Sequence, residues 1–134
     1  GTNYVKNNII YDMGRYGIYN DHYSGNMYAY NNTVYGCSWS GFHLSGGTEV
    51  LKNNISQNNG DGITYFDYTG RTTDAHNSNN VSSDSTAPGS NSKNSTTVSF
   101  VDSTNHDYHL AGTDTAARDA GTDLSSDSNL AFTT

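Results

Sequence analysis

Basic residues are scarce in this 134-residue chain, which has six Lys and Arg against thirteen Asp and Glu and a formal net charge of −7. The basic surface that phosphate backbones require is missing, so we expect no nucleic-acid partner. Long apolar runs are missing too, so we expect no membrane insertion. Cys37 is the only cysteine. No intrachain disulfide can therefore form, and we expect a small buried hydrophobic side chain at this position.

Proline and aliphatic residues are also few. Pro88 is the single proline, and 32% of the residues are hydrophobic. Such polarity is typical of disordered chains, but those usually carry many charges. Here charged residues make up 14% of the chain and aromatic residues 12%. A weakly charged chain rich in Asn, Gly, Thr and Tyr favours a turn-dense β protein, and its length suits one domain.

The chain does contain a repeat with a period of 21–24 residues. Pairs of asparagines end at Asn8, Asn32 and Asn54, which lie 24 and 22 residues apart. A second landmark keeps step, because the runs "GIYN", "GFHL" and "GITY" begin at residues 17, 41 and 62. The leucine framework of leucine-rich repeats and the apolar spacing of helices are both absent. We therefore predict a β-solenoid whose coils stack in parallel.

The runs "NNIIYDMGRYGIYN", "NNTVYGCSWSGFHL" and "NNISQNNGDGITY" resemble the right-handed parallel β-helix repeat of pectate-lyase-like proteins and of the alginate lyase and chondroitinase B group. The run "FVDSTNHDYHLAGTDTAARDAG" is similar to the closing segment of many such bacterial proteins. The resemblance implies an all-β, single-stranded right-handed parallel β-helix with about three regular coils and an irregular C-terminal coil. Such proteins have further coils before this point, so we expect the C-terminal end of a longer helix or an unusually short one.

The repeat divides the chain into four segments. Residues 1–68 hold the regular coils, 69–98 form a Ser- and Asn-rich excursion, 99–121 form a closing coil of the same domain, and 122–134 form a tail. The excursion includes the run "SNNVSS", which we interpret as a fourth Asn corner at Asn80.

Alignment of the repeats places residues in columns. Asn8, Asn32 and Asn54 are expected at successive corners, because Asn tolerates left-handed backbone and its amide can form a hydrogen-bonded ladder. Alternation along each strand then separates interior from outward columns. The predicted interior columns are Val5, Ala29 and Leu51, and Ile18, Phe42 and Ile63. The predicted outward columns are Tyr19, His43 and Thr64; Lys6, Tyr30 and Lys52; and Tyr11, Tyr35 and Gln57.

Polysaccharide is the partner that these outward columns favour. Tyrosines on stacked strands offer flat faces to sugar rings, and neighbouring polar groups can bind hydroxyls. We therefore predict ligand contacts at Tyr19, Tyr30, His43, Tyr11 and Tyr35. The alternative is that these tyrosines only pack as structural ladders.

Catalysis is a weaker prediction. A polysaccharide lyase needs a base and a cation that neutralises a uronate carboxyl, and the candidates are Lys6, Lys52, His43 and Arg15. The alternative is that they are ordinary charges on a solvated face. If the protein is an enzyme, we expect a lyase rather than a glycoside hydrolase, and catalytic residues can lie outside this chain.

Hydrolase and metal sites have less support in the sequence. A glycoside hydrolase needs paired carboxylates, whereas Asp12, Asp21 and Asp61 lie in separate turns. We predict no cofactor and no metal site. No calcium-loop motif is present, although Ca²⁺ stays open, and only His106 and His109 approach a zinc spacing.

The functional hypothesis is an extracellular or cell-surface bacterial module, the terminal part of a polysaccharide-binding or polysaccharide-degrading protein. The alternative is a structural subunit that stacks end to end with copies of itself into a filament, without catalysis. Unpaired strand edges at the ends of a solenoid favour such stacking.

Overall fold

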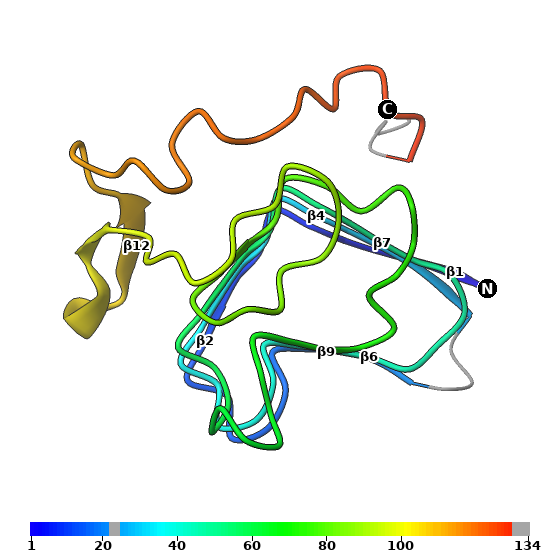
Figure 1. Cartoon of the computed structure of the whole chain (residues 1–134), viewed down its shortest axis with the longest axis horizontal. Coiled ribbons are helices and arrows are strands. Elements are labelled where there is room, and N and C mark those ends of the chain that lie inside the picture. The colour runs from blue at the N-terminus through cyan, green and yellow to red at the C-terminus, as the bar shows by residue number, and fades with distance from the viewer. Residues whose placement is uncertain (22–24, 130–134) are drawn as a thin grey trace.

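The computed structural model describes residues 1–21 and 25–129 and shows a parallel β-solenoid (Figure 1). Three parallel sheets run along it. Sheet A contains β1 (Thr2–Lys6), β4 (Asn26–Tyr30) and β7 (Glu49–Lys52). Sheet B contains β2 (Ile9–Tyr11), β5 (Thr33–Tyr35), β8 (Ile55–Gln57) and β10 (Val81–Ser82). Sheet C contains β3 (Ile18–Asn20), β6 (Phe42–Leu44) and β9 (Tyr68–Gly70).

Each coil visits the three sheets in turn, and the predicted fold class is confirmed. In Figure 1 the blue, cyan and green strands lie behind one another along a common outline. Val5 pairs with Ala29, and Ala29 with Leu51, which is the predicted interior column. The buried core combines such columns from all three sheets, including Met27, Leu44 and Phe42. Cys37 is buried in the same core, as expected for a small hydrophobic side chain.

The third glycine landmark was aligned wrongly. Phe42 pairs with Tyr68 rather than with Ile63, and Ile63 is 83% exposed. Thr69, not Thr64, follows His43 in its outward column. The cause is local: the Asp61 carboxylate accepts hydrogen bonds from three successive backbone N–H groups, at residues 63–65, and closes a separate loop there. Turn formation by Asp and Gly therefore displaced the strand by several residues.

The Asn corners are confirmed, with a division of roles between the two residues of each pair. Left-handed backbone falls on the first Asn of the pair, at residues 7, 31, 53 and 79. The second Asn forms the ladder: Asn8 Nδ2 donates to Asn32 Oδ1 at 3.0 Å, and Asn32 Nδ2 donates to Asn54 Oδ1 at 2.9 Å. Asn54 Nδ2 continues it to Asn80 Oδ1 at 3.0 Å, so the fourth corner exists as interpreted.

The expected excursion therefore contains a further coil. β10 pairs in parallel with β8, and single bridges join Ser78 to Ser90 and Val81 to Lys93. The turn around Pro88 folds back over this end of the solenoid, where Pro88 O accepts from Asn80 Nδ2 and Ala87 joins the core. Much of the segment 69–98 thus extends the stack rather than leaving it.

The C-terminal part leaves the solenoid and wraps around its outside. β11 (Phe100–Asp102) and β12 (Asp107–Leu110) pair with each other in antiparallel orientation across a short 3₁₀ turn, Ser103–Asn105. In Figure 1 this hairpin lies beside sheet B, and the orange and red segment after it passes along sheet A. Among the described residues no helix is long and apolar enough to cross a membrane.

Candidate functional site

The outward face of sheet B carries Tyr11 and Tyr35, and the C-terminal hairpin covers both. The ring of Tyr11 stacks on His106 with centroids 4.5 Å apart, and the ring of Tyr35 lies 5.1 Å from that of Tyr108. An ion pair of 2.9 Å between His106 Nε2 and Asp12 Oδ2 ties the hairpin to the first coil. These two predicted ligand contacts instead hold the protein's own hairpin.

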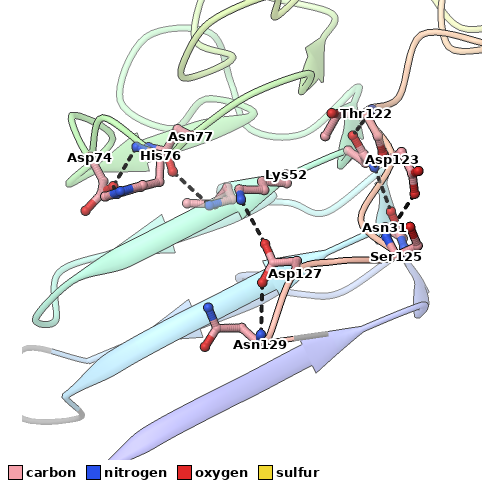
Figure 2. A network of polar contacts seen from close by, with 12 residues as sticks. Asn31, Lys52, Asp74, His76, Asn77, Thr122, Asp123, Ser125, Asp127 and Asn129 are labelled. Atoms are coloured by element: carbon pink, nitrogen blue, oxygen red, sulfur yellow. Dashed lines mark hydrogen bonds and ion pairs between the residues drawn. The ribbon is translucent and has the colours of Figure 1, made fainter. Parts of the chain in front are cut away.

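The outward face of sheet A is covered by residues 122–129. Tyr30, predicted as a ligand contact, is fully buried and packs with Leu124 and Val50. Lys52 Nζ pairs with Asp127 Oδ2 at 2.8 Å, and Lys6 Nζ donates to the backbone carbonyl of Asn129 (Figure 2). Burial and the nearby Asp127 carboxylate raise the pKa of Tyr30 above its usual range. The column Lys6, Tyr30 and Lys52 has the predicted register, but the chain itself occupies it.

Sheet C keeps an open aromatic face. We define the aromatic cluster as five side chains, Tyr16, Tyr19, Trp39, His43 and Tyr65. Tyr16 lies at its centre, with ring centroids 5.0 Å from Tyr19 and 4.4 Å from His43. Tyr19 is 52% exposed, so one ring of the cluster stays available to solvent.

A second stack extends the aromatic cluster toward the Asp61 loop. Trp39 and Tyr65 lie parallel, with a centroid distance of 4.8 Å and an interplanar angle of 4°. Trp39 meets Tyr16 edge-on at 5.1 Å, which joins the two stacks. The Arg15 guanidinium lies 4.2 Å from the Trp39 ring centre, a cation–π contact at the edge of the cluster.

The solenoid repeat positions these side chains. Tyr19 and His43 are register partners in β3 and β6. Trp39 N–H donates to Arg15 O at 2.9 Å, so the turns that precede these strands also stack coil on coil. Tyr65 comes from the loop that Asp61 closes, the same loop that overturned the third landmark.

Burial sets the protonation behaviour of the aromatic cluster. It lowers the pKa of His43, against a smaller opposing effect of Glu49, and it raises the pKa of Tyr16. His43 Nδ1 is buried and has no hydrogen-bond partner among the described residues. At neutral pH the cluster therefore presents a neutral imidazole among phenol rings, and Arg15 supplies its positive charge.

The four candidate catalytic residues do not meet in one place. Lys6 and Lys52 lie on sheet A under the C-terminal segment, whereas Arg15 and His43 belong to the aromatic cluster on sheet C. Among the described residues no group of three or more His, Cys, Asp or Glu side chains could hold a metal ion.

Sequence reasoning placed Tyr19, His43 and Arg15 among the candidates but omitted Trp39 and Tyr65. Trp39 could have been found, because it follows Arg15 by 24 residues, the period of the first two coils. Tyr65 carried no such signal, because it lies in a loop outside the repeat.

Comparison with known families places this arrangement in context. A family model described as "right handed beta helix region" matches residues 1–81. The match ends at the start of β10, in the fourth coil of the Asn ladder. Searches of curated proteins and of solved structures each found no match.

Proposed function

The chain belongs to the right-handed β-helix family, and on that premise we propose that it is an extracellular module that holds a polysaccharide on its aromatic cluster. The observation that supports this proposal is the half-exposed ring of Tyr19, which lies beside His43 and Tyr16 on the one sheet face that the C-terminal chain leaves open. Low Lys content and abundant Thr, Asn and Tyr are in keeping with an extracellular setting.

The chemistry of the aromatic cluster suits sugar rings. The C–H faces of a pyranose pack on aromatic rings, and phenol and guanidinium groups at the ring edges can bind its hydroxyls. Coils repeat along the solenoid about 4.8 Å apart, so a chain lying along sheet C meets Tyr19 and then His43. Arg15 adds a donor for hydroxyl or carboxyl oxygens.

Binding is tested by isothermal titration and affinity electrophoresis against neutral glucans, alginate, pectin and glycosaminoglycans. Tyr19→Ala should weaken binding about 3–10-fold, the loss expected for one aromatic contact. Tyr4→Ala is the matched control, because Tyr4 is also 52% exposed but stacks on Tyr28 in sheet A. Equal losses in both variants, or no binding to any polysaccharide, would overturn the proposal.

Polysaccharide cleavage is a separate question that the same panel addresses. A lyase would release unsaturated uronate, which is followed by its ultraviolet absorbance. We assign no catalytic role to Lys6, Lys52, His43 or Arg15, since the structure separates the lysines from the other two. Loss of uronate release in His43→Gln, with binding retained, would support catalysis at sheet C.

Self-stacking is the second candidate function. Among the described residues, β1, β2 and β3 are each paired along one edge only, which favours parallel pairing with another coil. Sedimentation and electron microscopy of the purified chain distinguish the two functions, since polymers that form without polysaccharide support the filament.

A further inference from the structure

A second cavity opens on the far side of the solenoid corner between sheets C and A. It has a volume of about 300 Å³ and lies between the β6–β7 turn and the loop before the fourth coil. Its lining is polar, and the residues are Gly47, Thr48, Glu49, Arg71, Thr73 and Asp74. None of them belongs to the aromatic cluster.

Glu49 is an anomaly in this cavity wall. It follows Met27 in an interior column and is only 2% exposed. Its Oε1 accepts from Asn20 Nδ2 at 2.8 Å and from Gly46 N–H at 2.9 Å. Its Oε2 is buried and has no partner among the described residues. A buried carboxyl oxygen without a partner is costly, so something outside the described contacts is expected to satisfy it.

Asp74 supplies a second carboxyl group to the same cavity. Its Oδ1 accepts from the backbone N–H of His76 and lies 2.8 Å from His76 Nδ1, as Figure 2 shows. No contact of the described residues is recorded for Oδ2. The cavity is therefore lined by two carboxyl groups, each with one oxygen held by the protein and the other left over.

We propose that this cavity binds a hard divalent cation of the size of Ca²⁺ between Glu49 Oε2 and Asp74. Calcium takes six to eight oxygen ligands from carboxylates, carbonyls and water, and hydroxyl and main-chain oxygens of Thr48, Thr73 and Gly47 line the same space. With only two carboxylates, affinity should resemble that of weak extracellular calcium sites, about 10⁻⁴–10⁻³ M. The net charge of −7 favours cation entry.

Arg71 is the competing explanation. Its guanidinium also lines the cavity, yet no ion pair joins it to Glu49 or to Asp74. If Arg71 turns inward in solution, it becomes the counterion of Glu49 and excludes the metal. If it stays outside, it only weakens cation binding by repulsion.

The test is thermal unfolding and isothermal titration with CaCl₂, with no carbohydrate present, so its outcome is independent of the proposed function. For a site of this affinity, 5 mM CaCl₂ should raise Tm by about 3–8 °C relative to EDTA. Glu49→Gln keeps the Oε1 acceptor and should abolish both the calcium shift and the binding heat. It should also raise Tm in EDTA, because a buried charge is removed.

Two further variants complete the design. Asp123→Asn removes an exposed acidic group far from the cavity and should keep the full calcium shift, whereas Asp74→Asn should reduce it about tenfold in affinity. Arg71→Gln should tighten calcium binding. If the wild type shows no calcium shift, or if Arg71→Gln lowers Tm in EDTA without tightening binding, the proposal is overturned and Arg71 is the partner of Glu49.

Discussion

At the scale of single residues, asparagine fills two different positions at each corner. The first Asn of the pair takes the left-handed conformation, which Asn adopts more readily than most residues. The second turns its amide inward, where it donates both to the Asn of the next coil and to a strand carbonyl, as Asn32 does to Val5 O. Asparagine is a poor strand former, but neither position is within a strand.

The ladder makes a matched pair of predictions. Asn32 is buried and its amide has partners on both sides, so Asn32→Ala should lower the free energy of unfolding by about 3 kcal/mol, because several buried polar groups lose their partners. Asn8 stands exposed at the end of the ladder, and Asn8→Ala should cost about 1 kcal/mol. Urea unfolding measures both, and equal costs would contradict a ladder whose buried middle carries more of the stability.

His43 sets a pH dependence of stability. Burial lowers its folded-state pKa below the unfolded value of about 6.5. The unfolded chain therefore takes up the proton first, and this contribution is complete above about pH 6.5 and is lost as pH falls through that region. His43→Gln should flatten the fall in urea midpoint between about pH 7.5 and pH 5. Parallel curves for the wild type and the variant would rule out His43 as the cause.

At the scale of the coil, two glycines explain why the repeat begins each sheet C strand as it does. A Cβ on Gly41 would lie 2.2 Å from Ser56 Oγ and 2.8 Å from the Asp67 carbonyl of the next coil. A Cβ on Gly17 would lie 2.3 Å from Val34 Cγ1. Adjacent coils approach too closely at this column for a side chain that points inward.

Gly41→Ala should therefore lower the free energy of unfolding by about 3 kcal/mol through overpacking. Gly112→Ala is the control, because a Cβ there meets no atom within 4 Å, and its effect should stay within about 0.5 kcal/mol. Chemical denaturation compares the two variants. A tolerated Gly41→Ala would mean that the coils can separate at this corner.

The third coil replaces that glycine with Asp67, and the exchange links two coils. Asp67 is buried, and its Oδ2 accepts from Ser83 N–H and Ser83 Oγ, both at 2.7 Å, while Oδ1 accepts from Asn59 Nδ2 at 2.9 Å. Burial raises the pKa of Asp67 despite these bonds. A carboxyl group thus makes the connection between the third coil and the less regular fourth.

At the scale of the whole molecule, the C-terminal part decides which surfaces remain free. The hairpin lies on sheet B, and residues 120–122 then dock on the corner asparagines, where Thr122 N–H donates to Asn53 Oδ1 at 2.8 Å and Asn79 Nδ2 donates to Ala120 O at 2.9 Å. The segment that follows closes sheet A through Leu124 and Asp127. Two of three outward faces are thereby removed from ligand binding.

Leu124 should control how firmly this segment holds. It is buried against Tyr30 and Val50, so Leu124→Ala should reduce amide-exchange protection in residues 122–129 about 10–100-fold while the coils keep theirs. Tyr30 should then ionise at lower pH, since burial is the main cause of its raised pKa. Leu110→Ala, on the partly exposed hairpin strand, is the control. Unchanged protection would mean that polar contacts alone hold the segment.

The candidate site could be predicted only in part. Tyr19 and His43 follow from the repeat, because register pairs residues one period apart. Tyr65 and the open state of sheet C do not follow from it, since the first depends on a loop closed by Asp61 and the second on where the C-terminal chain docks. The buried oxygen of Glu49 could not be predicted either, because it is the missing donor above it that makes the position unusual.

By itself, the sequence determined the coil, the Asn ladder and the interior column Val5, Ala29 and Leu51, because these rest on spacings repeated along the chain and on contacts between neighbouring coils. Only the tertiary structure decided the third-coil register and the burial of Tyr30, Tyr11 and Tyr35. These depend on contacts between residues up to about a hundred positions apart, such as His106 with Asp12. No periodicity encodes such contacts, because each is made once and is selected by the packing free energy of the whole fold.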